Sequence, residues 1–303
     1  MPGLHIALLL LATGGIWGLT PSLAKMAMAE GVPAPGFAFW TALGSGLLLA
    51  LVCRMRGLHL PLGRRHLRYY AAAGISGFAL SNLAGFHALQ HIPAGFFAMV
   101  VPLAPMLTVL GAALLGQERL TLRRAGGTAL GFAGIALAMA PGAALPDVGL
   151  ILWALVAVGA PLGYATANLV AVQWAPGGTP ALPLAAGTML AAAAFLGLFG
   201  AGLGPWHWPF TGTALADALV LAQAVLTALA YLMFFRLIAG AGAVVTSQVG
   251  YVATITGVFW GAIFFQERMG WLALPAVVLI FAGLWLVTRR PARPVVREAP
   301  PPR

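Results

Sequence analysis

The 303-residue chain is 61% hydrophobic and only 7% charged, whereas soluble domains carry about 25% charged residues. Its net charge of +10 could indicate a nucleic-acid partner, but in so apolar a chain basic residues mark the cytoplasmic loops of a membrane protein. Cys53 is the single cysteine, which excludes an intrachain disulfide and a cysteine metal cluster. We therefore expect the lipid bilayer as a partner, no nucleic acid and no cofactor.

Long stretches without Asp, Glu, Lys or Arg predict the elements in chain order. The stretches are 2–24, 31–53, 69–117, 125–146, 148–216, 218–235, 237–266 and 269–288. A spanning helix needs about 20 apolar residues, so 69–117 and 148–216 each hold two, divided at HIPAG (91–95) and APGGTPALP (175–183). The sequence thus predicts an all-α membrane protein with ten transmembrane helices. Residues 1–5 carry no Lys or Arg, so 2–24 is expected to be a membrane helix and not a signal peptide.

The distribution of basic residues predicts the orientation. With both termini in the cytoplasm, fourteen of the sixteen Lys and Arg residues face that side, and only Lys25 and Arg268 remain. Positive residues are concentrated in cytoplasmic loops. The Pro-rich tail 291–303 is expected to be a disordered cytoplasmic segment.

The chain also contains an internal repeat. Shifted by 149 residues, Gln117-Glu118-Arg119 falls on Gln266-Glu267-Arg268, and Gly134 falls on Gly283. We therefore divide the chain into a five-helix repeat at 1–143, a second at 144–290 and the tail 291–303. Because five is odd, the two repeats are expected to be inverted, an arrangement typical of secondary transporters. Inversion also explains why only the first copy, on the cytoplasmic side, is followed by Arg123 and Arg124.

The repeated stretches resemble a known family. Trp17-Gly18 and LLGQERLTLRRAGGTALGFAGIALA (114–138) are similar to an EamA-type domain of the drug/metabolite transporter superfamily. FFQERMGWLALPAVVLIFAGLWL (264–286) resembles a second such domain, with Leu162-Gly163 in place of the Trp-Gly pair. The resemblance implies a ten-helix transporter, and the YddG-type aromatic amino-acid exporters are the branch it looks closest to.

Polar and aromatic residues at membrane depth are the candidates for substrate binding, because each is costly there without a partner. They are Trp17, Pro21, Ser81, Asn82, Phe86, Met99, Pro102, Tyr164, Asn168, Tyr231, Gln248 and Tyr251. Asn82 and Tyr231 occupy matching positions of the repeat, which favours a site on the pseudo-two-fold axis. The alternative for each residue is a contact that only holds helices together.

The acidic residues narrow the choice of substrate. All six fall at predicted helix ends or beyond them, so no carboxylate is expected at mid-membrane to relay a proton or bind a cation. Zwitterionic or neutral amphiphilic solutes fit better. The leading hypothesis is an exporter of amino acids or related metabolites in a bacterial inner membrane. It works by alternating access at a midplane cavity, and ten helices suffice for a monomer to enclose one.

Two other function classes are weighed against transport of organic solutes. His87 and His91, one turn apart, could serve a channel or metal-ion permease, although a histidine at the membrane interface is the commoner role. An intramembrane enzyme is disfavoured, because the chain has no G-x-S-x-G, no H-E-x-x-H and no mid-membrane aspartate pair. The two Gln-Glu-Arg copies are expected to cap helices and hold turns, and Lys25 to extend toward the membrane surface.

Overall fold

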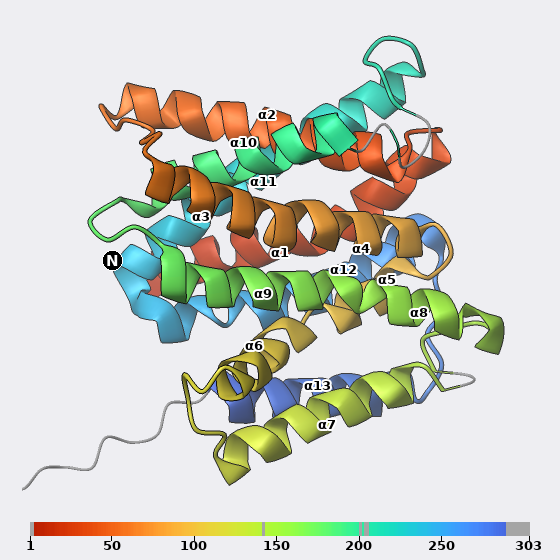
Figure 1. The fold of residues 1–303 in the computed structure, drawn as a ribbon. Helices are drawn as coiled ribbons and strands as arrows, with labels where there is room; N and C mark the ends of the chain where they lie inside the picture. The colour runs from red at the N-terminus through yellow and green to blue at the C-terminus, as the bar shows by residue number, and fades with distance from the viewer. Residues whose placement is uncertain (1–2, 141–142, 200–201, 203–205, 289–303) are drawn as a thin grey trace, which may run out of the picture.

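Helices make up most of the part of the chain that the structure describes. The computed structural model covers residues 3–140, 143–199, 202 and 206–288, and no β-strand occurs among them (Figure 1). Up to residue 140 the elements are α1 (Gly3–Ala29), α2 (Ala34–Met55), α3 (Arg64–Gly74), the π-helical turn η1 (Ile75–Leu80), α4 (Ser81–Leu89), α5 (Ala94–Val100), α6 (Leu103–Leu114) and α7 (Leu122–Ala138). From residue 143 onward they are the 3₁₀ turn η2 (Val148–Leu150), α8 (Ile151–Ala157), α9 (Gly159–Trp174), α10 (Ala181–Phe199), α11 (Ala214–Thr246), α12 (Val249–Phe265) and α13 (Ala273–Thr288). The predicted all-α class is confirmed.

Six segments of the described chain are long and apolar enough to cross a membrane. They are Gly3–Ala29, Ala34–Met55, Ala94–Leu114, Val148–Trp174, Ala181–Phe199 and Ala214–Gly242. α12 and α13 are shorter apolar helices. A hydrocarbon core of about 30 Å accepts helices of these lengths, so the chain is a multi-pass membrane protein.

Several spans are interrupted at proline, at glycine or at a π-helical turn. Pro102 stands between α5 and α6, and Pro161 follows closely after the junction of α8 and α9. Gly242 has φ of 77° and ψ of 171° inside the segment labelled α11, a conformation that glycine adopts readily and other residues avoid. Proline removes a backbone N–H donor, and a residue outside the helical region interrupts the regular helical hydrogen bonds.

Glycines bring α7 and α13 into close antiparallel contact. A Cβ added to Gly127 would lie 2.8 Å from the carbonyl oxygen of Gly283, and one added to Gly134 would lie 2.8 Å from that of Ala276. The start of α7 therefore lies beside the end of α13, and the end of α7 beside the start of α13 (Figure 1). Since each Gln-Glu-Arg stretch directly precedes one of these helices, the two stretches lie at opposite ends of the bundle.

The core joins the two halves of the chain. α1 packs against α11 and α12, and α2 packs against α10 and α11. The aromatic side chains of Phe37 and Phe86 are buried between α2 and α4, with ring centroids 5.2 Å apart. Gly18 of α1 lies so close to α12 that an added Cβ would be 2.5 Å from the carbonyl oxygen of Ala253. Small residues allow this approach, as in other membrane helix pairs.

Candidate functional site

An aromatic cluster lies where α1 meets α11. The rings of Trp17 and Tyr231 are 6.1 Å apart between centroids and meet edge to face at 78°. Phe234, one turn further along α11, lies 5.0 Å from Trp17. The structure thus brings together two of the predicted site residues from different halves of the chain. Edge-to-face pairs of this kind hold aromatic rings in a fixed orientation.

A polar group continues the same contact between α1 and α11. Gln223 donates its side-chain N–H groups to the hydroxyls of Thr20 at 3.1 Å and Thr227 at 3.0 Å. Its side chain is 2% exposed, and its Oε1 atom has no hydrogen-bond partner among the described residues. Burying a carbonyl without a donor costs free energy, so this oxygen is a candidate acceptor for a substrate N–H group.

Gln223, Thr227 and Tyr231 follow one another at intervals of four residues and so share one face of α11. With Trp17 and Thr20 of α1 they form what we call the α1–α11 seam. The sequence pattern showed Thr20, Gln223 and Thr227 as mid-helix polar residues, but only the packing of α1 on α11 singles them out from other such residues. Tyr231 and Trp17 were predicted site residues.

The predicted residues of the third span are positioned by the π-helical turn η1. Ser81 donates to the carbonyl of Ser76 at 2.8 Å, and Asn82 donates to the carbonyl of Phe78 at 2.8 Å. Both side chains are buried, as is Phe86 one turn later. A π-helical turn shifts the helix register by one residue and is frequent at functional sites. Both carbonyls that accept these bonds belong to residues of this turn.

The other predicted residues divide into a buried group and an exposed group. Met99 and Pro102 are buried, as is Pro21 of α1, and Tyr164 and Tyr251 pack against the main core. Asn168 and Gln248 are exposed. Asn168 nevertheless donates to the hydroxyl of Thr108 at 3.2 Å, which joins α9 to α6.

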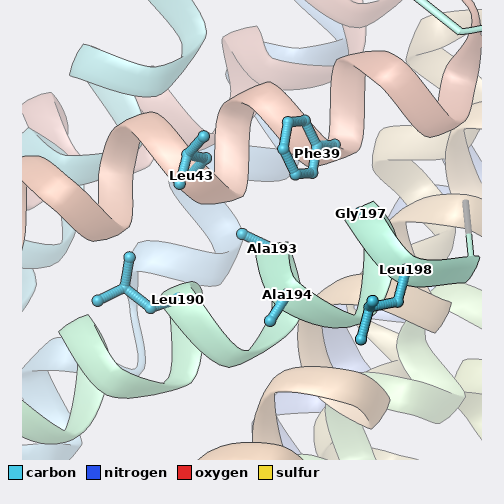
Figure 2. A pocket seen from close by; sticks show the side chains of 7 residues that line it. All are labelled: Phe39, Leu43, Leu190, Ala193, Ala194, Gly197 and Leu198. Carbon is cyan, nitrogen blue, oxygen red and sulfur yellow. The ribbon is translucent and has the colours of Figure 1, made fainter.

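Two surface grooves lie away from the predicted residues. The groove between α2 and α10 has a volume of about 440 Å³ (Figure 2). Its lining consists of Phe39, Leu43, Leu190, Ala193, Ala194, Gly197 and Leu198. A second groove, of about 500 Å³, adjoins α3 and α10. Both linings are mainly apolar and carry no charged side chain to pair with a charged or zwitterionic solute, and none of the predicted site residues lines either groove.

The second Gln-Glu-Arg stretch makes a contact between the two halves. The Glu267 carboxylate accepts hydrogen bonds from the backbone N–H groups of Ala94 at 2.7 Å and Gly95 at 2.9 Å. Lys25 lies 3.4 Å from the same carboxylate and donates to the carbonyl of Ile92 at 2.8 Å. Glu267 therefore does cap a helix, but the helix is α5, far away in sequence. Lys25 pairs with Glu267 and does not extend freely to the membrane surface.

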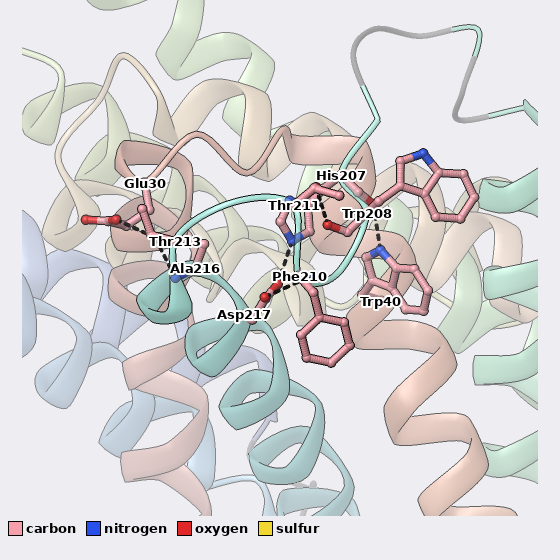
Figure 3. A network of polar contacts seen from close by, with 9 residues as sticks. All are labelled: Glu30, Trp40, His207, Trp208, Phe210, Thr211, Thr213, Ala216 and Asp217. Atoms are coloured by element: carbon pink, nitrogen blue, oxygen red, sulfur yellow. Dashed lines mark hydrogen bonds and ion pairs between the residues drawn. The ribbon is translucent and has the colours of Figure 1, made fainter.

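Further polar contacts hold the loops at the same end of the bundle (Figure 3). Asp217 accepts from the backbone N–H of Phe210 at 2.8 Å and pairs with His207 at 3.1 Å. Glu30, directly after α1, accepts a hydrogen bond from the Thr213 hydroxyl at 2.7 Å. These contacts tie the start of α11 to the end of α1 and to the stretch 206–210.

The two histidines of the alternative hypothesis make separate contacts. His87 contacts the carbonyl of Leu83 at 2.8 Å through Nδ1. The ring of His91 stacks on Trp153, with centroids 3.7 Å apart. Among the described residues no group of three or more His, Cys, Asp or Glu side chains could hold a metal ion.

Comparison with known proteins identifies a family. The sequence profile of the EamA-like transporter family matches residues 4–140 and again 151–289. An uncharacterized transporter of Bacillus subtilis (strain 168), YvbV, is 26% identical over 301 residues, covering 96% of this chain and 93% of the relative. A solved protein crystal structure superposes with a TM-score of 0.65 at 21% identity, over 94% of this chain and 96% of that one. At this identity the superposition supports the fold alone.

Proposed function

Because the chain belongs to the EamA-like transporter family, we propose that it is a secondary transporter that exports neutral or zwitterionic amino acids and related metabolites. Family membership supports the transport of small solutes. It favours neither the metal-ion permease nor the intramembrane enzyme. The proposed location is a bacterial inner membrane with both termini in the cytoplasm, which the basic residues of the loops support.

The helix pairing supports two inverted five-helix repeats at 1–143 and 144–290. In this proposal the spans of the first half are α1, α2, α3 to α4, α5 to α6, and α7. Their counterparts are α8 to α9, α10, α11, α12 and α13. The contact of α1 with α12 then corresponds to that of α6 with α9, and the contact of α1 with α11 to that of α9 with α4. The contact of α7 with α13 and the contact of α2 with α10 each join a helix to its own counterpart in the other repeat. A two-fold relation between the halves produces this pattern.

The α1–α11 seam carries the substrate proposal. It offers aromatic faces at Trp17 and Tyr231 and an unpartnered amide oxygen at Gln223. The eight helical steps from Gln223 to Tyr231 span about 12 Å of helix. Aromatic rings attract an ammonium group or an apolar side chain, and the amide oxygen accepts from an N–H group. Neutral or zwitterionic amino acids combine these features, and the aromatic amino acids suit the rings best.

Counterflow into liposomes tests the proposal directly. Purified protein is reconstituted with one unlabelled amino acid inside, and uptake of the labelled amino acid is followed. We expect accumulation of at least one neutral or aromatic amino acid above protein-free liposomes, and a loss of at least about tenfold for Trp17→Ala, the effect of removing ~1.4 kcal/mol of binding. No counterflow with any amino acid would contradict the amino-acid assignment, and Zn²⁺ flux in the same liposomes would favour the permease.

A further inference from the structure

We propose that Lys25 and Glu267 form a gate that closes one end of the transport pathway, and that Glu118 is its counterpart at the other end. This inference rests on the proposed transport function. In the proposed orientation, the Lys25–Glu267 gate faces outward and the structure represents the inward-facing state. The gate would open and close once in each transport cycle.

The bonds of the gate cross between the two halves of the chain. Glu267 precedes α13, whereas Lys25 belongs to α1 and both N–H donors belong to α5. The first N–H groups of a helix have no acceptor within that helix, so the Glu267 carboxylate supplies the acceptor that Ala94 and Gly95 lack. Opening this end would break the hydrogen bonds of these two amides and expose Glu267 and Lys25 to water.

Glycines leave room for the Glu267 carboxylate between α5 and α12. A Cβ on Gly261 of α12 would lie 2.5 Å from Oε2 of Glu267, and one on Gly95 would lie 2.5 Å from the terminal methyl group of Met269. Ala98 of α5 lies within 2.5 Å of the position of a Cβ on Gly257. α5 and α12 therefore approach each other closely at this end, and the side chains of Glu267 and Met269 fill the space beside their glycines.

Glu118, at the matching repeat position, has very different surroundings. Its side chain is 52% exposed, whereas that of Glu267 is 11% exposed. Its ion-pair partner is Arg124, which lies in the first turn of α7 within the same half of the chain. The two glutamates of the repeated motif thus differ in their surroundings. Glu267 is bonded across the two halves at one end, whereas Glu118 is exposed at the other. Alternating access requires such an asymmetry and its reversal in the opposite state.

Hydrogen exchange of the full-length protein in lipid nanodiscs tests the gate without any substrate. Glu267→Gln weakens the charge-assisted bonds to α5 and breaks the ion pair. We expect exchange of the Ala94 and Gly95 amides to rise about tenfold, the change that ~1.4 kcal/mol produces. Exchange at the junction of α11 and α12, residues 245–250, should fall, because closing the opposite end protects it. Lys25→Met should change both segments in the same directions by a smaller factor.

Two matched variants serve as controls. Glu30→Gln removes a carboxylate at the same end, bonded to Thr213, and should leave the exchange of Ala94 and Gly95 unchanged. Glu118→Gln removes the counterpart and should not raise their exchange. If the Glu267→Gln variant exchanges faster at both ends of the bundle, the protein is loosened generally and the gate proposal is overturned. Unchanged exchange in this variant would also overturn the proposal.

Failure of the gate and failure of the transport proposal give different results. Counterflow by the wild type together with unchanged exchange in Glu267→Gln would reject the gate alone. Absence of counterflow by the wild type, together with opposite changes of exchange at the two ends, would reject the amino-acid substrates and retain the gate.

Discussion

Gln223 shows how a single side chain can be both a helix contact and a binding group. Its two N–H donors hold Thr20 and Thr227, while its carbonyl oxygen is left without a donor in the described structure. A contact that served packing alone would be expected to use both ends of the amide, because an unpaired buried acceptor costs roughly 1–3 kcal/mol. The free oxygen is therefore the part of the residue that favours a role in binding.

Gln223→Leu tests this role. Leucine keeps the volume roughly constant and removes the acceptor, so we expect the concentration for half-maximal counterflow to rise at least about tenfold, as the loss of one bond worth ~1.4 kcal/mol predicts. The melting temperature in detergent should change little or rise. The substitution removes two hydrogen bonds, but it also removes the buried carbonyl oxygen that has no donor. Gln173→Leu, the same change at an exposed position of α9, is the control and should transport normally. Equal transport by both variants would contradict the role of Gln223.

At the scale of helices, α7 and α13 hold the repeats together through backbone contact. A Cβ on Gly283 would lie 2.4 Å from the carbonyl oxygen of Gly127 and 2.7 Å from the backbone nitrogen of Gly131. Backbone atoms cannot yield as the end of a flexible side chain can. The glycine at this position is therefore required by the close approach of the helices.

Gly283→Ala should lower the stability of the protein by about 1–3 kcal/mol, the usual effect of overpacking, measured as a lower melting temperature in detergent. Gly126→Ala on α7 provides the comparison, since nothing lies within 4 Å of its added Cβ. That variant should be neutral or more stable by up to about 1 kcal/mol, because alanine favours a helix over glycine. The packing account fails if Gly283→Ala melts no lower than Gly126→Ala.

For the whole molecule, the charge distribution predicts its direction in the membrane. The two Gln-Glu-Arg stretches lie at opposite ends of α7 and α13, and only the first is followed by two more arginines. The same loop motif occurs once on each side of the membrane. The positive-inside rule predicts that only the cytoplasmic copy carries additional arginines.

Reporter fusions test this direction. Green fluorescent protein fused after residue 290 should fluoresce in bacterial cells, and alkaline phosphatase at the same point should be inactive, because that point is expected in the cytoplasm. Fusions truncated within 266–272 should behave in the opposite way. Active phosphatase after residue 290 would reverse the orientation and place the Lys25–Glu267 gate on the inner side.

The sequence alone determined the membrane class, the all-α fold, the family and the matching positions of Glu118 and Glu267. These follow from composition, charge spacing and local motifs, which act along the chain and need no knowledge of packing. Only the tertiary structure decided that Trp17 meets Tyr231, that Gln223 bonds Thr20, and that Glu267 caps α5 while Glu118 faces solvent. Those contacts join residues far apart in the chain, and they depend on how helices approach each other through small residues. No periodicity within one helix contains that information.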